Sequence, residues 1–316
     1  MKYALSDTIH MVALDKIPIP VAGVALGTAS LGNLLNAYSE TAHWLCFGIA
    51  LLFILLLLGR LIVDPESIRR DLCDPVIAGV SGTFPMALMV MSTYISGSYY
   101  ELALAIWGSA IIMHILLMIH YTRRFIIGMD MKKIFASTFI VYVGIAVAGV
   151  TSPFLDMRTI GSVTVYFGAL ILIPLFVLIT YRYIKCPGYP RPTFPLLCIY
   201  SAPASLCIAG YMQSFDHMML EVLIPAYILA CVLYVFGLAI MVRTIAMEFY
   251  PSYAALTFPL VISAIASKNM SSCLEGNMSE IVSVISSAET VICTMVVAYV
   301  VMRYLAYIVG AIRNDS

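Results

Sequence analysis

Two stretches of this sequence contain the same tripeptide: Ala78-Gly79-Val80-Ser81-Gly82-Thr83-Phe84-Pro85-Met86-Ala87-Leu88 and Tyr253-Ala254-Ala255-Leu256-Thr257-Phe258-Pro259-Leu260-Val261-Ile262. In both, a proline falls within an apolar run long enough to cross a bilayer. Proline removes one backbone hydrogen bond of a helix and frees a carbonyl. Hydrocarbon offers that carbonyl no partner, so protein or a water-filled cavity must cover it. The two stretches therefore predict broken helices that surround a polar passage.

The composition indicates a membrane protein. Of 316 residues, 62% are hydrophobic and 11% are charged, against roughly 25% charged residues in ordinary soluble domains. The charged residues separate apolar runs of about 20 residues, the length that spans a ~30 Å hydrocarbon core. Outer-membrane barrels would show ~10-residue alternating segments instead. We therefore expect a polytopic helical membrane protein, without a signal peptide and, at zero net charge, without a nucleic-acid partner.

The apolar runs predict ten transmembrane helices in a single transmembrane domain over residues 1–316. Ten spans of ~21 residues leave ~100 residues for the loops and tails, which fits short connections. The expected spans are about 20–38, 42–63, 74–95, 101–121, 134–155, 159–183, 194–213, 219–241, 251–268 and 279–309.

The odd-numbered spans differ in composition from the even-numbered ones. Odd spans carry small and hydroxylic residues and a proline near or within them, whereas even spans are more uniformly aliphatic. Small residues let backbones approach closely or line a cavity, and bulky aliphatic residues suit lipid. This alternation predicts five helical hairpins around a central pore, with odd helices inside and even helices outside. The expected helix hinges are Pro85, Pro153, Pro203 and Pro259.

The basic residues predict the orientation of the chain, because cytoplasmic loops are enriched in Lys and Arg. With ten spans, all but two of the 17 basic residues fall on one side, and only Arg158 and Lys268 fall on the other. Both termini are then cytoplasmic, and the expected location is the cytoplasmic (inner) membrane. The basic residues expected on the cytoplasmic side are Lys2, Lys16, Arg60, Arg69, Arg70, Arg123, Arg124, Lys132, Lys133, Arg182, Lys185, Arg191, Arg243, Arg303 and Arg313.

The expected passage is lined by hydroxyl groups rather than by charges. No Lys, Arg, Asp or Glu lies near the middle of an odd span, whereas coupled transporters place an ionisable group there to bind ions or protons. Without a fixed cation, selectivity among anions should be shallow. Glu289, in the last even span, is either a coupling acid or a helix-packing residue. The expected pore-lining residues are Gly27, Thr28, Ser30, Ser81, Thr83, Thr151, Ser152, Ser201, Ser205, Thr257 and Ser263.

Phe84 and Phe258 are the two candidates for a gate. Each follows a threonine and precedes a hinge proline, so each is expected where the helix opens toward the polar interior. An aromatic ring in a narrow lumen blocks conduction by excluding water. The alternative for either residue is ordinary packing in a transmembrane helix. The pair Gly23 and Gly27 also has two interpretations, a helix-packing face or a thin pore wall.

Other kinds of site have little support in the sequence. His114 and His120 are six residues apart and face different directions on a helix, whereas metal ligands on one helix are three or four residues apart. We expect neither a metal nor a cofactor. The eight cysteines are isolated along the chain and are read as small apolar residues. No Gly-x-Ser-x-Gly motif is present, so an enzyme is the weakest hypothesis.

The motifs resemble those of the tellurite-resistance/dicarboxylate transporter family, which includes bacterial TehA proteins and the slow anion channels of plant guard cells. The resemblance rests on Gly-x-Ala-Leu-Gly-x-Ala in the first span, Gly-Thr-Phe-Pro-Met in the third and Tyr-x-x-x-Thr-Phe-Pro in the ninth. It implies a quasi-fivefold arrangement of hairpins, a homotrimer and a phenylalanine that occludes the pore, matched here by Phe258. The first span departs from the family pattern because its proline, Pro20, lies at its start.

The sequence thus predicts an anion channel or facilitator that passes small anions such as chloride and nitrate. Two alternatives stay open: a proton-coupled C4-dicarboxylate carrier or exporter of oxyanions such as tellurite or sulfite, and a membrane scaffold or enzyme with a closed core. Flux that follows a pH gradient and depends on Glu289 would favour the carrier.

Overall fold

The computed structural model describes residues 16–128 and 130–313, so the predicted cytoplasmic residue Lys2 lies outside the described chain. The described residues form helices and contain no strand. The α-helices are α2 (Val21–Leu35), α3 (Glu40–Val63), α4 (Pro65–Asp71), α5 (Pro75–Val80), α6 (Thr83–Ile95), α7 (Tyr100–Tyr121), α8 (Thr138–Tyr142), α9 (Val147–Thr151), α10 (Arg158–Lys185), α11 (Ala202–Ser214), α12 (Leu220–Ile245), α13 (Phe258–Cys273) and α14 (Gly276–Arg313). A π-helical turn, η1 (Thr122–Ile126), and the 3₁₀ helices η2 (Met131–Lys133), η3 (Gly144–Ala146), η4 (Ser152–Leu155), η5 (Arg191–Ser201) and η6 (Pro251–Leu256) join them.

The structure has the helices of a polytopic membrane protein. Within the described residues, seven helical stretches are long and apolar enough to cross a membrane. Two further apolar stretches, Val21–Leu35 and Gly144–Leu155, are shorter, and η6 with α13 occupies the place of the ninth expected span. The membrane-spanning class is therefore established, and the number of ten crossings stays a prediction.

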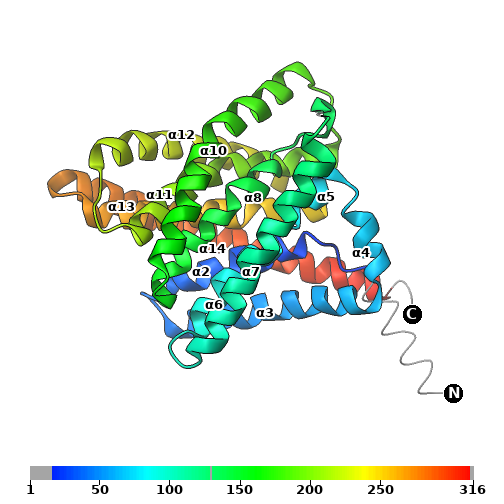
Figure 1. Cartoon of the computed structure of the whole chain (residues 1–316), viewed down its shortest axis with the longest axis horizontal. Helices are drawn as coiled ribbons and strands as arrows, with labels where there is room; N and C mark the ends of the chain where they lie inside the picture. Colours follow the sequence, from blue (N-terminus) through cyan, green and yellow to red (C-terminus); the bar gives the residue numbers. More distant parts are fainter. Residues whose placement is uncertain (1–15, 129, 314–316) are drawn as a thin grey trace.

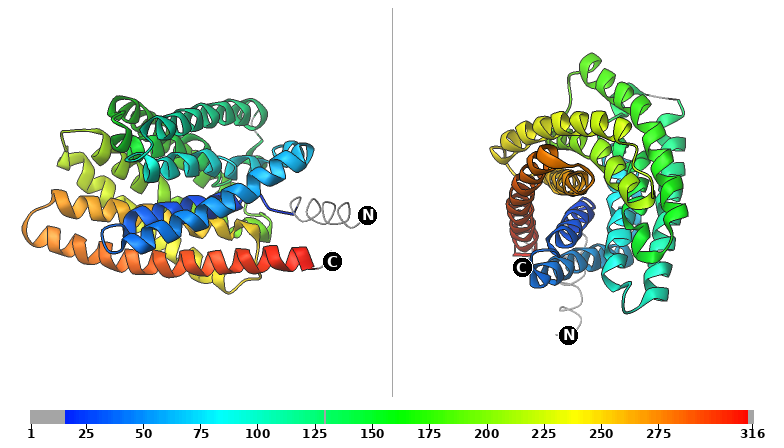
Figure 2. Two further views of the ribbon diagram at one scale, coloured as in Figure 1. Left: turned by 90° about the horizontal axis from the view of Figure 1, so that it is seen from below. Right: turned by 90° about the vertical axis from the view of Figure 1, so that its left-hand side faces the viewer.

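Five inner segments form a closed ring. They are α2, α5 with α6, α8 with η3 and α9, η5 with α11, and η6 with α13. In ring order α2 contacts α6, α6 contacts α9, α9 contacts α11, α11 contacts α13, and α13 returns to α2. Each inner segment also packs against the long helix that follows it, namely α3, α7, α10, α12 or α14. Figure 1 shows the labelled helices, and Figure 2 shows α3 and α14 running alongside α2.

The inner segments are much more buried than the helices that follow them. In the most apolar part of Arg191–Ser214, 94% of the residues are buried, whereas the value is 22% for Tyr100–Ile126. Almost every residue of α2 is buried as well. The long outer helices expose Leu, Ile and Val side chains along their length, as expected of surfaces that face lipid. The predicted separation of inner and outer helices is therefore present in the structure.

Three of the four expected hinge prolines lie where an inner segment breaks. Pro85, Pro203 and Pro259 occupy the first turn of α6, α11 and α13, where a missing backbone N–H costs little because that group has no helical partner. Pro153 differs, because it lies in η4 at the end of its segment. The middle of that segment is broken instead at η3, Gly144–Ala146. α2 runs unbroken from Val21 after Pro20, so its departure from the kinked pattern is real.

Candidate functional site

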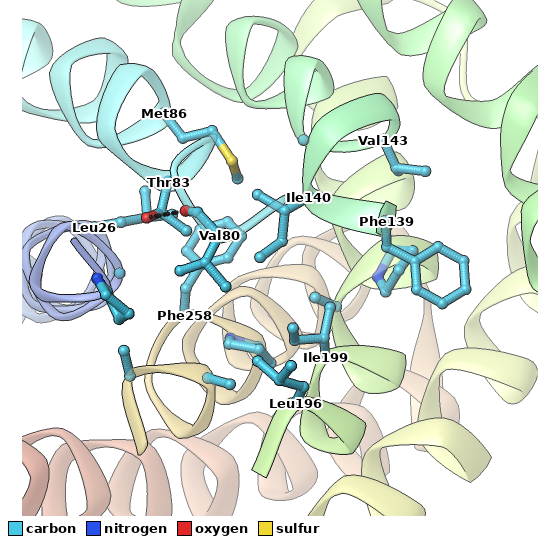
Figure 3. A pocket seen from close by; sticks show the side chains of 18 of the residues that line it. Leu26, Val80, Thr83, Met86, Phe139, Ile140, Val143, Leu196, Ile199 and Phe258 are labelled. Atoms are coloured by element: carbon cyan, nitrogen blue, oxygen red, sulfur yellow. Dashed lines mark hydrogen bonds between the residues drawn. The ribbon is translucent and has the colours of Figure 1, made fainter. Parts of the chain in front are cut away.

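An apolar cavity lies inside the ring of inner segments. Figure 3 shows Leu26, Val80, Ile140, Ile199 and Phe258 around it, one from each of the five inner segments. The volume open to the centre of a water-sized sphere is about 40 Å³, space for only a few water molecules. Its lining contains two hydroxyl side chains, and Thr83 Oγ1 already donates to the Val80 carbonyl at 2.7 Å. The apolar cavity therefore offers an anion almost no replacement for its water shell.

A polar cavity lies on the other side of Phe258. All five inner segments line it, with an open volume of about 160 Å³. Its polar lining residues are Ser30, Asn33, Thr151, Gln213, Lys268 and Asn269. Val90, Val147 and Ile262 form part of its apolar wall. This cavity can therefore bring both hydrogen-bond donors and a positive charge to an anion.

Phe258 is the boundary between the two cavities. Among the described residues it alone lines both, and its side chain is only 7% exposed. It is the first residue of α13, directly after the break that follows η6. The Phe258 side chain thus lies at the break of its own inner segment.

A wide vestibule continues the apolar cavity away from Phe258. It has an open volume of about 680 Å³ and shares Pro20, Val80, Leu196 and Ser252 with the apolar cavity. Its charged lining residues are Lys16, Arg60, Asp71, Asp74 and Lys132. Its three basic residues belong to the predicted cytoplasmic set, whereas Lys268 of the polar cavity belongs to the opposite set. The order along the axis is therefore vestibule, apolar cavity, Phe258, polar cavity.

The Arg60 side chain helps to shape the wall of the vestibule. It is 6% exposed and donates to the Ile17 carbonyl at 2.7 Å, to Ser67 Oγ at 2.5 Å and to Asp71 Oδ2 at 2.7 Å. These bonds join α3 to α4 and to the segment that precedes α2. Arg60 is therefore committed to structure, and its charge is compensated by Asp71.

The position of Phe258 is fixed by a close crossing of α2 and α13. Thr257 Oγ1 lies 3.0 Å from the Gly23 carbonyl and 2.7 Å from the Ala254 carbonyl. A Cβ atom at Gly27 would come within 2.4 Å of Thr257 Cβ and 2.8 Å of the Phe258 backbone nitrogen. A side chain at position 27 would therefore push the backbone of the gate candidate itself. Gly23 and Gly27 form a packing face, and Gly23 also lines the apolar cavity.

Only three of the expected pore-lining hydroxyl residues line an axial cavity: Thr83 in the apolar cavity, and Ser30 and Thr151 in the polar one. Most of the others bond to backbone carbonyls or to each other, whereas Thr28 Oγ1 is buried without a hydrogen-bond partner in the described structure. Ser205 Oγ and Ser263 Oγ, for example, are 3.1 Å apart between α11 and α13. Hydroxyl groups in these helices mostly donate to the backbone carbonyl three or four residues earlier. The sequence pattern does not distinguish such a hydroxyl from one that lines the cavity. The expected lining residues that line neither axial cavity are Gly27, Thr28, Ser81, Ser152, Ser201, Ser205, Thr257 and Ser263.

The structure places Phe84 away from the axis. Phe84, Pro85 and Ser81 line a separate groove with Leu57 and Met113 of the outer helices α3 and α7. In this first copy of the tripeptide it is Thr83 that lines the apolar cavity. Phe84 therefore cannot occlude the axial cavities from its position, and we do not propose it as a gate.

Glu289 is buried outside the ring of inner segments. Its side chain is 4% exposed and lies on α14 beside Ser267 of α13, whose hydroxyl accepts a hydrogen bond from Tyr227 Oη at 2.9 Å. Glu289 Oε2 has no hydrogen-bond partner within the described chain. It lines neither axial cavity, so an ion on the axis would not touch it.

The histidines lie in separate packing positions. The His114 ring is fully buried, with Nε2 3.0 Å from the Val141 carbonyl. His120 is exposed in the last turn of α7, with Nε2 3.5 Å from the Leu72 carbonyl. Residues 16–128 and 130–313 hold no group of three metal-ligating side chains.

Sequence reasoning missed the polar residues of the second cavity. Lys268 was read only as a marker of orientation, and Asn33, Gln213 and Asn269 were not singled out. A helical-face projection from Phe258 would have found part of the set, because Phe258, Ile262, Ile265 and Asn269 follow i, i+4, i+7 and i+11 spacing and all line the polar cavity. The expectation of a passage without a fixed cation is thus wrong for this cavity, because Lys268 lines it.

Comparison with known families agrees with this architecture. A search of curated proteins finds no match. A family model described as a voltage-dependent anion channel, SLAC1, matches residues 16–305. The match confirms the family resemblance and supports an anion channel or transporter. Because it covers nearly the whole chain, the protein belongs to the SLAC1 family of voltage-dependent anion channels.

Proposed function

We propose that the protein is an anion channel or facilitator whose axial path is closed by the ring of Phe258. The observation that carries this proposal is that Phe258, among the described residues, alone lines both axial cavities. Small anions such as chloride and nitrate would pass from one cavity to the other once the ring moves aside.

The apolar cavity explains why the closed state would resist leakage. An anion that enters it gives up water and meets mostly apolar side chains, aliphatic and aromatic. A narrow hydrophobic constriction excludes water and therefore blocks ions even without complete steric closure. The break at Thr257 provides the hinge, because α13 begins at Phe258 and a rotation there would carry the ring with it.

The test is a comparison of Phe258→Ala and Phe84→Ala in planar bilayers with purified protein. Removal of the Phe258 ring is expected to raise anion conductance on the order of tenfold or more, equivalent to ~1.4 kcal/mol or more of barrier. Phe84→Ala removes the same ring from the outer groove and should leave conductance near that of the wild type. Unchanged conductance in both variants would remove the gate assignment.

The family resemblance and the sequence add finer features to the proposal. The resemblance adds assembly as a homotrimer. The distribution of basic residues adds a location in the cytoplasmic membrane with both termini in the cytoplasm, and the motif content of the sequence adds function without a cofactor or enzymatic step. The two ends of the described chain lie at the same end of the molecule (Figure 2), which supports the placement of the termini on one side.

The coupled-carrier alternative, with dicarboxylates or oxyanions such as tellurite or sulfite as cargo, depends on Glu289. That residue lies behind α13 and lines neither axial cavity, which favours passive passage. Proton-coupled uptake that Glu289→Gln abolishes would reverse this preference.

A further inference from the structure

The polar cavity contains a positive charge that no acidic residue compensates. Lys268 lines it, and no carboxylate of the described chain lies within ion-pair distance of its Nζ. No acidic residue is present among the described residues that line the cavity. Lys268 Nζ lies 5.3 Å from the centre of the Tyr38 ring, a contact that holds the ammonium group without neutralising it.

Two neutral hydrogen-bond donors of the same cavity also lack partners. Ser30 is 3% exposed and Asn269 is half-buried, and neither Ser30 Oγ nor Asn269 Nδ2 has a hydrogen-bond partner in the described structure. Buried donors are almost always satisfied, so an unsatisfied one indicates a missing partner. Thr151 is different, because its hydroxyl accepts from Trp107 Nε1 at 2.8 Å and donates to the Val147 carbonyl at 2.9 Å.

From these groups we infer that the polar cavity is a binding site for one small monovalent anion with oxygen acceptors, a class that includes nitrate and small monocarboxylates. Ser30, from α2, and Lys268 with Asn269, from α13, would supply the contacts. The inference deepens the proposed function, because it places a bound ion directly against Phe258.

The charge of the lining residues determines the charge of the anion that the cavity can bind. One ammonium group compensates one negative charge, and the remaining polar lining residues are neutral. The second charge of a dicarboxylate would lie against aliphatic side chains such as Val90 and Ile262, where an uncompensated charge is costly. The open volume of about 160 Å³ accommodates a polyatomic anion together with some water.

The mixture of donors also predicts which monovalent anions bind best. Hydrogen-bond donors converge from two inner helices, and an anion with several oxygen atoms can accept from Ser30, Asn269 and Lys268 at once. Chloride can also accept these bonds, but it lacks separate acceptor atoms for donors on the two neighbouring helices α2 and α13. The affinity should nevertheless be modest, because an ion that binds too tightly does not leave a conduction path.

Equilibrium binding to purified full-length protein tests this site without any current. The midpoint of thermal unfolding is measured against the concentration of sodium nitrate, sodium chloride or disodium succinate at constant ionic strength. A ligand that binds the folded state raises this midpoint with its concentration. We expect nitrate to raise the unfolding midpoint more than chloride does. Succinate should raise it no more than chloride does.

Variants at Lys268 identify the cation. Lys268→Met should weaken nitrate binding about tenfold, equivalent to ~1.4 kcal/mol, and Lys268→Arg should retain most of it. Ser30→Ala should weaken binding a few-fold, since one donor is lost. The control is Arg158→Met, which removes the other basic residue predicted on this side; Arg158 pairs with Asp216 at 2.8 Å, is largely exposed and does not line the cavity.

Each outcome decides the inference. Nitrate stabilisation that Lys268→Met leaves unchanged, or succinate stabilisation greater than that by nitrate, would overturn it. A general salt effect would appear equally in Arg158→Met and Lys268→Met, and would overturn it as well. Binding and gating can fail separately: loss of nitrate binding in Lys268→Met together with unchanged current in Phe258→Ala would retain the site and remove the gate.

Discussion

The apolar and polar cavities are built from the same five inner segments, and yet they have opposite chemistry. Much of the apolar cavity is lined by residues before or at the breaks of the four broken segments, such as Val80, Ile140 and Ile199, and by Leu26 of the unbroken α2. The polar cavity is lined by residues farther along the same segments, including Ser30 and Lys268. The breaks therefore mark a change from a barrier to a place where an anion can rest, and Phe258 lies at that change.

The two copies of Thr-Phe-Pro show how a small structural difference alters the role of a residue. Both threonines bond to the carbonyl three residues earlier, Thr83 Oγ1 to Val80 and Thr257 Oγ1 to Ala254, each at 2.7 Å. The segment before Thr83 is the α-helix α5, whereas η6 before Thr257 is a 3₁₀ helix. A 3₁₀ helix has 3.0 residues per turn instead of 3.6, so the same tripeptide presents a different side chain to the axis.

Gly27→Ala should have the largest effect on the packing of α2 against α13 at Phe258. The added Cβ would meet Thr257 and the Phe258 backbone at 2.4–2.8 Å, and overpacking of this kind costs ~1–3 kcal/mol. A clear fall in the thermal unfolding midpoint of the purified protein is expected. Gly48→Ala on α3 is the control, because no atom beyond the neighbouring residues and backbone of α3 lies within 4 Å of the new Cβ. Equal midpoints for both variants would contradict the described crossing.

Thr257→Val should have a smaller effect on the same crossing. Valine keeps the shape of threonine but removes the hydroxyl that lies 3.0 Å from the Gly23 carbonyl, a change of about 0.5–1.5 kcal/mol. We expect a lower unfolding midpoint and a higher open probability in recordings, because α13 is less firmly held to α2. Thr257→Ser retains the hydroxyl and should behave like the wild type; equal behaviour of the serine and valine variants would show that the bond is unimportant.

One substitution made on each side of Phe258 tests the contrast between the cavities. In a Phe258→Ala background, Val80→Thr adds a hydroxyl to the apolar cavity, whereas Val90→Thr adds one to the polar cavity. Easier wetting of the apolar cavity should raise conductance a few-fold, which is under ~1 kcal/mol of barrier. Val90→Thr should change it less. A larger increase in conductance from Val90→Thr would place the main barrier in the polar cavity, which contradicts the proposal.

Glu289→Gln is expected to have the smallest effect on anion flux. The substitution keeps the size of the side chain and its hydrogen-bonding capacity beside Ser267, and the site lies behind α13. Anion flux into liposomes should be the same with and without a pH gradient, in the variant as in the wild type. Uptake that follows the gradient and disappears in the variant would instead identify a proton-coupled carrier.

Much of the fold could be predicted from the sequence because membrane burial leaves a strong compositional pattern. Long aliphatic runs predicted the outer helices, and small or hydroxylic residues predicted the inner ones. Whether an individual side chain lines a cavity or packs between helices was less predictable. Ser201 and Thr257 are hydroxylic like Ser30, but Ser201 donates to the Cys198 carbonyl of its own segment and Thr257 donates to the Gly23 carbonyl of α2. Only tertiary packing decides between these roles. Phe84 and Phe258 likewise have the same immediate neighbours, Thr and Pro, and the type of helix before each one separates them.

The central claim is that Phe258 alone divides the axis, and side-specific cysteine labelling tests it most directly. In protein whose eight native cysteines are replaced by alanine, single cysteines are placed at Val80 or Val90, and a charged membrane-impermeant thiol reagent is added to either face of oriented vesicles. We predict that Val90→Cys reacts only from the Lys268 face and Val80→Cys only from the Arg60 face. Both should become reactive from both faces when Phe258→Ala is added. Labelling of either cysteine from both faces while Phe258 is intact would contradict the account.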